Sequence, residues 1–355
     1  MRGVDTLGRL DADAGALRLR LDTLNRQLAT GRRAEAPGDM APQLPRVSEL
    51  RAEISRRGAY GAAIGEALDR AGATQAALGR LSGIAREFGA GVALALKASD
   101  PDAVPLAAAR ARAALVEVGQ VLNTRHGGEY LFAGSDSANP PVPAPDELPA
   151  SGLASRIAAA VASLGGGNAA GVAAATRAAA ASDAAGTTPF SAFLSSGPGL
   201  AEPRRSVPAE DGAAVSYGVA ANRNAAAVSG GETAGGWARD LLRGLASIAA
   251  LTPAQAAASP ADFDAFLGAV RGGLRSATDA LADEAGALGL AETRLEKAQR
   301  RHADADTALR TQLAAIEEVD LAEVLSRLQA TETTLQASYA AIGRLGGLTL
   351  ASFLR

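Results

Sequence analysis

The sequence predicts a mainly α fold: a long antiparallel heptad-repeat helical rod built from both chain ends, with an inserted small α+β outer domain. Two observations carry this prediction. Apolar residues recur at heptad spacing in both ends of the chain, a pattern typical of helices that pair along their length. The middle of the chain lacks this spacing and is rich in proline and glycine, which interrupt helices. The chain is therefore expected to assemble through helix seams.

The first seam lies near the N-terminus. In residues 4–30 the apolar side chains step by three and four, and Gly31 ends the segment. We assign residues 1–47 to an N-terminal assembly helix and loop. The residues expected to form its assembly interface are Leu7, Leu10, Leu17, Leu21, Leu24 and Leu28.

The next segment has the longest apolar repeat. The spacing predicts a helix over residues 48–97, with a further helix over 104–125 alongside it. Residues 48–135 form the N-terminal half of the rod in this division. Glycines recur every seven residues beside the seam, at Gly58, Gly65, Gly72 and Gly79. Either a second helix approaches closely there, or the spacing reflects the glycine-rich composition, and both interpretations stay open.

The C-terminal third returns to heptad spacing. Seven apolar residues fall on one register that is interrupted by His302: Leu267, Leu274, Leu281, Leu288, Leu295, Leu309 and Ile316. Residues 264–315 are expected to run antiparallel to 48–97. Residues 236–319 form the C-terminal half of the rod, and 320–355 the C-terminal assembly helix. The interface expected on that helix consists of Leu321, Leu325, Leu328, Leu335, Tyr339 and Ile342.

Residues 136–235 form the inserted outer domain. Five prolines crowd residues 140–149, and short β-like runs occur near Thr188–Leu194 and Ala213–Ala220. The expected core of the insert consists of Phe190, Phe193, Val215, Tyr217 and Val219.

Composition argues against catalysis. Among 355 residues there is no cysteine, aromatics make up 3%, and the formal net charge is −3. No phosphate loop, metalloprotease motif or nucleophile elbow occurs, so we expect no enzyme, cofactor, metal site or small-molecule substrate. The charge gives no argument for a nucleic-acid or membrane partner. His126, in a turn-like stretch, and His302, at a seam position, are interpreted as structural.

Two terminal stretches resemble the flagellin superfamily. In residues 21–42, LDTLNRQLATGRRAEAPGDMAP, a heptad helix ends at Thr-Gly-Arg before a Pro/Asp-containing loop. The family has two acids in that loop, whereas here Asp39 is followed by Met40. Residues 317–355 contain an acidic Val-Asp-Leu-Ala entry, a Leu-Gln-Ala-Ser run and a Leu-Thr-Leu ending, which are similar to the matching C-terminus.

A third stretch resembles one subfamily, that of hook-associated protein 3. The stretch is NTRHGGEYLFAGS, residues 123–135, and the residues carrying the likeness are Asn123, Thr124, Arg125, Tyr130, Leu131, Phe132 and Gly134. The resemblance implies an extracellular structural subunit that joins the flagellar hook to the filament. It implies self-association, contacts with other hook-associated and flagellin subunits, and an export chaperone at the C-terminal end.

The resemblance also implies export without a cleaved signal peptide. The N-terminal residues have acids where a secretory signal needs an apolar core. Two alternatives stay open: the filament flagellin itself, and a cytoplasmic coiled-coil adaptor, which accounts for the seams but not for residues 123–135. Because each terminal stripe is narrow, residues 1–35 and 320–355 are expected to be largely unfolded before assembly.

Overall fold

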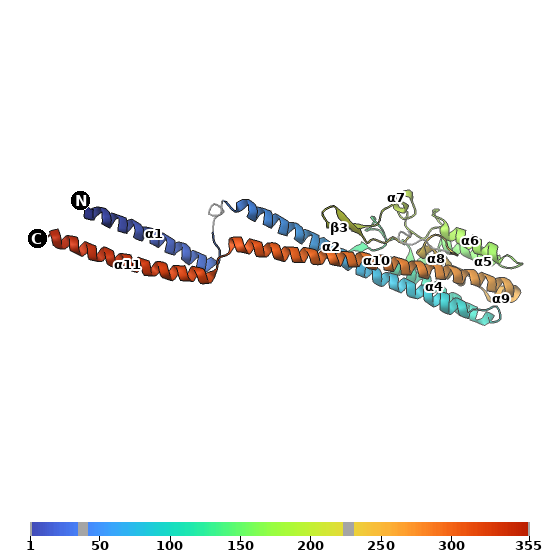
Figure 1. Ribbon diagram of the computed structural model, residues 1–355. Coiled ribbons are helices and arrows are strands. Elements are labelled where there is room, and N and C mark those ends of the chain that lie inside the picture. The colour runs from blue at the N-terminus through green and yellow to red at the C-terminus, as the bar shows by residue number, and fades with distance from the viewer. Residues whose placement is uncertain (1, 35–41, 223–230, 354–355) are drawn as a thin grey trace. The chain divides into compact units, whose positions relative to one another are not determined.

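The computed structural model describes residues 2–34, 42–222 and 231–353, with side chains for 8–34, 42–222 and 231–344. The chain divides into two compact units, residues 1–59 with 302–355 and residues 60–301. Among the described residues, the strands form two small antiparallel sheets and helices make up most of the rest (Figure 1). The predicted fold class, mainly α with long helices from both chain ends and a small α+β insertion, is confirmed.

The first unit contains α1 (Arg2–Thr30) and α11 (Leu321–Phe353) together with parts of two longer helices. These parts are the start of α2 (Leu44–Arg86) and the end of α10 (Pro260–Glu317). Gly31 ends α1 with a φ of 68°, a left-handed conformation that glycine adopts without a steric penalty. Asp320 begins α11, because its side chain accepts hydrogen bonds from the amides of Ala322 and Glu323 at 2.8 and 3.2 Å.

The second unit is built on three helices: α2, α10 and α4 (Val104–Leu122). The predicted seams lie inside it. Ile64, Leu78 and Leu81 of α2 are buried. The leucines of α10 on the heptad register are buried too: Leu267, Leu274, Leu281, Leu288 and Leu295. Heptad spacing therefore located this core correctly along both long helices.

The predicted helix over residues 48–97 is less regular than expected at its end. After Arg86 the chain forms a π-helical segment, η2 (Glu87–Val92), and a short helix, α3 (Ala93–Ala95). Gly89 lies in the π-helical segment, and a Cβ atom there would lie 3.2 Å from the Cβ of Leu274. The missing side chain lets the two helices approach closely at this point.

The periodic glycines, in contrast, bring no second helix close. A Cβ atom built at Gly58, Gly72 or Gly79 meets no described atom within 4 Å, and at Gly65 it meets only the side-chain amide of Gln299 at 3.7 Å. Within the chain, these glycines leave open surface. The structure therefore favours the compositional interpretation over a close helix contact inside one subunit.

The insert follows a hairpin of two short strands, β1 (Arg125–His126) and β2 (Glu129–Tyr130). It contains η4 (Pro145–Ala150), α5 (Gly152–Ala162), α6 (Ala169–Ala181) and α7 (Gly197–Leu200). A second hairpin pairs β3 (Ser206–Glu210) with β4 (Ala213–Ser216). Two further helices, α8 (Trp237–Ala249) and α9 (Pro253–Ala258), lead into α10.

One predicted strand was wrong and another was too long. Residues 188–194 form turns rather than a strand. Thr188 and Ser191 use their hydroxyl groups to hold the local backbone, accepting from the amides of Phe190 and Leu194, which competes with strand pairing. The strand predicted over 213–220 ends at Ser216, although Ala220 forms an isolated bridge with Ala133.

Helix α8 anchors the insert to the long helices. Its residues from Trp237 to Ile248 are all buried, including Arg239, Asp240 and Arg243. Arg243 donates to the carboxylate of Glu232 at 2.7 Å and to the hydroxyl of Thr176 at 3.0 Å. Buried charges with such partners avoid the desolvation penalty of an isolated charge, so this cluster fixes α6 against α8.

Candidate assembly interface

Helices α1 and α11 pack against each other in antiparallel directions (Figure 1). At one end, the amide of Val319 donates to the carbonyl of Gly31 at 3.0 Å, and the amide of Arg33 donates to the carbonyl of Glu317 at 2.8 Å. Farther along, Arg18 lies over the ring of Tyr339, with its guanidinium carbon 5.1 Å from the ring centroid. The two chain ends thus form a helical hairpin, which we call the terminal hairpin.

The core of the terminal hairpin is small. Leu24, Val324 and Leu328 form its buried cluster, with Leu21 and Val319 partly buried beside them. Fully burying one leucine contributes about 1.5–3 kcal/mol, whereas ordering each backbone residue costs about 1–2 kcal/mol. The cluster therefore contributes little to holding two helices of 29 and 33 residues in place.

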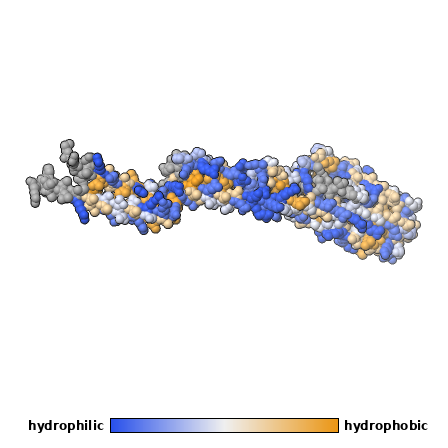
Figure 2. Space-filling model, viewed as in Figure 1, coloured by the Kyte–Doolittle hydropathy of each residue, from blue (hydrophilic) through white to orange (hydrophobic). Residues whose placement is uncertain are grey.

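Much apolar surface remains uncovered on the terminal hairpin. Leu19 is 70% exposed, Leu321 51% and Leu325 44%. Leu28 and Tyr339 are also exposed, at 38% and 39%. Figure 2 shows apolar residues on the visible surface of this hairpin. Exposed apolar residues gathered on one element mark a protein–protein contact surface.

The structure divides the residues assigned to the interface from the sequence into three groups. Leu24 and Leu328 are buried inside the hairpin, whereas Leu28, Leu321, Leu325 and Tyr339 are exposed. The half-buried members are Leu10, Leu17, Leu21, Leu335 and Ile342. Leu7, Asp39 and Met40 lie outside the residues whose side chains are described.

Sequence reasoning does not identify two residues of the terminal hairpin, one exposed and one buried. Leu19 is the most exposed leucine among the described side chains of the hairpin, but it lies off the seam register, so heptad spacing does not identify it. Val324 is buried beside Leu24, although the interface predicted on α11 contains only the leucines around it. The alternation of arginine and leucine over residues 18–21 was the available signal that α1 presents apolar residues on more than one face.

Residues 123–135, which carry the subfamily resemblance, lie in the second unit rather than on the terminal hairpin, and Leu131, Phe132 and Ala133 among them are buried. The side chain of Asn123 forms two hydrogen bonds with the backbone of Val142. Its Nδ2 donates to the carbonyl at 2.7 Å, and its Oδ1 accepts from the amide at 3.0 Å. The backbone carbonyl of Thr124 accepts a hydrogen bond from the amide of Leu131 at 3.0 Å. Phe132 is fully buried and meets Trp237 edge-on, with ring centroids 6.1 Å apart.

Charged groups complete this motif. Glu129 accepts from Arg205 at 2.6 Å and from Arg70 at 2.9 Å, and the hydrogen bond from Arg205 holds the pKa of the Glu129 carboxyl below its usual value. Burial lowers the pKa of Arg70, which also donates to the carbonyl of Tyr130 at 2.7 Å. Gly134 adopts a φ of 68° next to Glu202, and Arg125 lies 5.1 Å from the ring centroid of Tyr130. The motif thus joins α2, α4 and the insert.

Both histidines contact other parts of the protein. His302 is buried, and its Nδ1 lies 3.3 Å from a guanidinium nitrogen of Arg57 on α2. His126 pairs with Glu129 in the first hairpin, across the turn formed by Gly127 and Gly128. Among the side chains that the structure describes, no three histidine, aspartate or glutamate residues cluster as metal ligands would. No helix in the described part of the chain is long and apolar enough to cross a bilayer.

Comparison with known families identifies the C-terminal part of the chain. Residues 272–354 match the family described as the bacterial flagellin C-terminal helical region, a range that covers most of α10 and all of α11. A comparison with curated proteins finds no match. The family match supports the flagellin superfamily and indicates a structural, non-enzymatic subunit of the bacterial flagellum, an extracellular polymer that forms by self-association.

Proposed function

We propose that this protein is a structural subunit that joins the flagellar hook to the filament and assembles through its terminal hairpin. The observation that carries the proposal is the exposed apolar surface of that hairpin, with Leu19, Leu321 and Leu325 uncovered. A hairpin with so small a core gains stability when neighbouring copies cover these residues. Other hook-associated and flagellin subunits are the partners that fit this position.

The junction role, in preference to the filament itself, is supported by the resemblance of residues 123–135 to the hook-associated subfamily. The residues proposed to contact neighbours are those assigned from the sequence on both terminal helices, with Leu19 added. Leu24 and Leu328 serve this surface indirectly, because they hold α1 against α11. The proposal includes export without a cleaved signal peptide and an export chaperone that binds the C-terminal end.

A second candidate is the filament flagellin, which the description of the matched family favours. Deleting the gene separates the two functions. A strain lacking a junction protein makes hooks, fails to attach filaments and releases flagellin into the medium. A strain lacking its flagellin makes hooks and releases no flagellin, which would contradict the junction role.

The interface is tested by placing charges on the exposed leucines. Leu19→Asp with Leu325→Asp puts two carboxylates where the proposal buries leucines, and a desolvated unpaired charge is strongly unfavourable. We expect cells with this variant to make hooks without filaments, while the purified variant keeps its helix content by circular dichroism. Leu106→Asp, at a leucine 68% exposed on α4, is the matched control and should support normal filaments.

Substituting the buried leucines would be a poorer test. Leu24→Asp would disrupt the cluster with Val324 and Leu328, so lost assembly would not distinguish a broken hairpin from a broken interface. Normal filaments on cells carrying the Leu19→Asp and Leu325→Asp variant would refute the proposed interface.

A further inference from the structure

One side of the α2–α10 pair in the second unit is left uncovered by the part of the insert that the structure describes. On the covered side of α10, Gly273, Ser276 and Ala280 are buried. On the uncovered side, a stripe with steps of four and three is exposed or half-buried throughout: Arg271, Arg275, Thr278, Ala282, Ala285, Gly289, Glu292 and Glu296. We call this side of the helix pair the open face.

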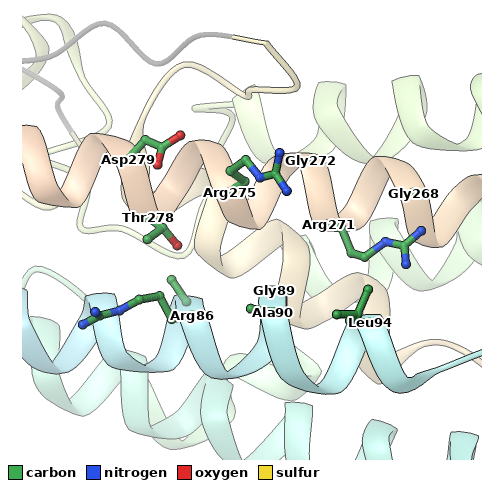
Figure 3. Close-up of a pocket in the computed structure, with 11 residues that line it drawn as sticks. Arg86, Gly89, Ala90, Leu94, Gly268, Arg271, Gly272, Arg275, Thr278 and Asp279 are labelled. Carbon is green, nitrogen blue, oxygen red and sulfur yellow. The ribbon is translucent and has the colours of Figure 1, made fainter.

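One end of the open face is basic. Arg86 of α2 and Arg271 and Arg275 of α10 line a groove whose walls include Gly89, Ala90, Gly268 and Gly272. Among the described residues, none of the three arginines has a carboxylate within ion-pair distance. Figure 3 shows Arg271 and Thr278 extending from α10 toward the facing helix, whereas Asp279 points away from it. The groove thus holds unneutralised positive charge.

The other end of the open face is acidic. Glu292 and Glu296 lie 21 residues, or three heptads, beyond Arg271 and Arg275, which places them on the same side of α10 and about 31 Å farther along at ~1.5 Å per residue. Burial and the neighbouring charge of Glu296 raise the pKa of Glu292. Glu296 has one weak described ion pair, with Arg300 at 3.9 Å. On α2, Asp69 is exposed at the same end.

If two copies of this stripe are aligned in antiparallel directions, the charges of one copy lie opposite charges of the other sign. Counted from its two ends, Arg271 corresponds to Glu296 and Arg275 to Glu292. The inner positions pair small residues with each other: Thr278 with Gly289, and Ala282 with Ala285. The residues of α2 beside this stripe have the same symmetry. In an antiparallel pair of copies, Arg86 of one copy corresponds to Asp69 of the other, and Gly72 to Gly83.

We propose that the open face is an interface with a second copy of this chain, which packs antiparallel across a two-fold axis near residues 283 and 284 of α10. In this arrangement three arginines of each copy meet three carboxylates of the other. The small residues between them let the helices approach, as small residues do in other helix contacts. A two-fold pair satisfies both charged ends at once, because the same surface serves both copies.

Ion pairs at such exposed positions are individually weak and are screened by salt. The full-length protein should therefore form a reversible dimer at about 50 mM salt in analytical ultracentrifugation, with an affinity that falls about tenfold or more by 500 mM. A chain that stays monomeric at ~200 µM in low salt would refute the proposal. This surface is separate from the terminal hairpin, so Leu19→Asp with Leu325→Asp should leave the dimer intact.

Charge reversal tests the pairing of the two ends. Arg271→Glu with Arg275→Glu makes both ends acidic, and Glu292→Arg with Glu296→Arg makes both ends basic, so each variant alone should lose at least about tenfold in affinity. An equimolar mixture should regain it, because acidic ends then meet basic ends. Arg112→Glu with Arg156→Glu, which reverses two arginines exposed on α4 and α5, gives the same change in net charge and should leave dimerisation unchanged.

Disulfide trapping tests the antiparallel orientation, since the chain has no native cysteine. Thr278→Cys and Gly289→Cys chains should cross-link when mixed and oxidised, because these positions face each other across the pair. Neither should cross-link alone, since the two identical positions lie about 16 Å apart at ~1.5 Å per residue. Cross-linking of each variant with itself, or a charge-reversed mixture that stays monomeric, would overturn the proposal.

Discussion

The two units of this protein bury apolar side chains in very different ways. In the second unit a single core runs from the long helices through α8 into the insert, and it includes Phe132, Trp237 and Ile157. In the terminal hairpin the core is a separate cluster of Leu24, Val324 and Leu328. One unit has a large interior within one chain, whereas the other buries only this small cluster within one chain.

This difference separates folding from assembly. The second unit contains the buried charges and the motif of residues 123–134, so its stability is determined within the subunit. The terminal hairpin has long helices with exposed leucines, so its stability should depend on subunit contacts. A subunit that must polymerise only at its destination benefits from such a division, because the polymerising element gains most of its order on assembly.

The largest expected effect comes from truncating the core of the second unit. Phe132→Ala removes a fully buried ring that packs against Trp237 and should lower the free energy of unfolding by about 3–5 kcal/mol. Leu24→Ala, in the terminal hairpin, should leave the main unfolding transition almost unchanged. Urea titration followed by tryptophan fluorescence measures this, since Trp237 is the single tryptophan. Equal losses from both substitutions would show that the two units unfold together.

Amide hydrogen exchange on the purified monomer compares the local stability of the two units along the chain. Residues 78–88 lie in the core of the second unit, whereas residues 17–28 and 325–342 lie in the terminal hairpin. We expect protection at least about a thousandfold lower in the hairpin, because local opening there exposes only a small cluster. Comparable protection in all three segments would refute the expectation that the chain ends are disordered before assembly.

Heptad spacing predicted the long helices well because their burial repeats with the same period. The register predicts a seam along α10, and its leucines from Leu267 to Leu295, spaced seven residues apart, are buried. Heptad spacing does not show whether an apolar residue packs within its own chain or is left exposed. It therefore does not distinguish Leu24, which packs inside the hairpin, from Leu325, which is exposed. The charge cluster of Glu232, Asp240 and Arg243 also escaped prediction, because it joins residues whose proximity depends on the fold.

The third prediction concerns Asp240, the fully buried carboxylate of α8. Burial raises its pKa, although Thr233 donates to it at 2.6 Å and the amide of Ala234 at 2.5 Å. An acid whose pKa is higher in the folded state contributes stability that is full below its unfolded value and is lost as the pH rises through the folded value. The wild-type protein should therefore gain stability relative to Asp240→Asn as the pH falls from 7 to 4.

Urea titrations of both proteins across that range give the required difference. The subtraction removes the contribution of the other carboxylates, which titrate in both proteins. A difference that is independent of pH, or that favours Asp240→Asn at low pH, would contradict the raised pKa. Glu129, whose pKa is lowered, provides a comparison of opposite sign: its contribution should be lost as the pH falls.

The smallest effect is expected from an ion pair on the surface of the second unit. The Nε of Arg80 on α2 donates to Glu117 on α4 at 2.6 Å, and the two side chains are 63% and 36% exposed. Water screens both charges, so a double-mutant cycle with Arg80→Ala and Glu117→Ala should give a coupling below about 1 kcal/mol that shrinks with added salt. Arg243→Ala, at a side chain 2% exposed, should cost about 3–5 kcal/mol, because Glu232 loses its buried partner and keeps only Arg177, which is 37% exposed. Equal losses of stability from the two pairs would contradict the expectation that burial makes the Arg243 pair the stronger one.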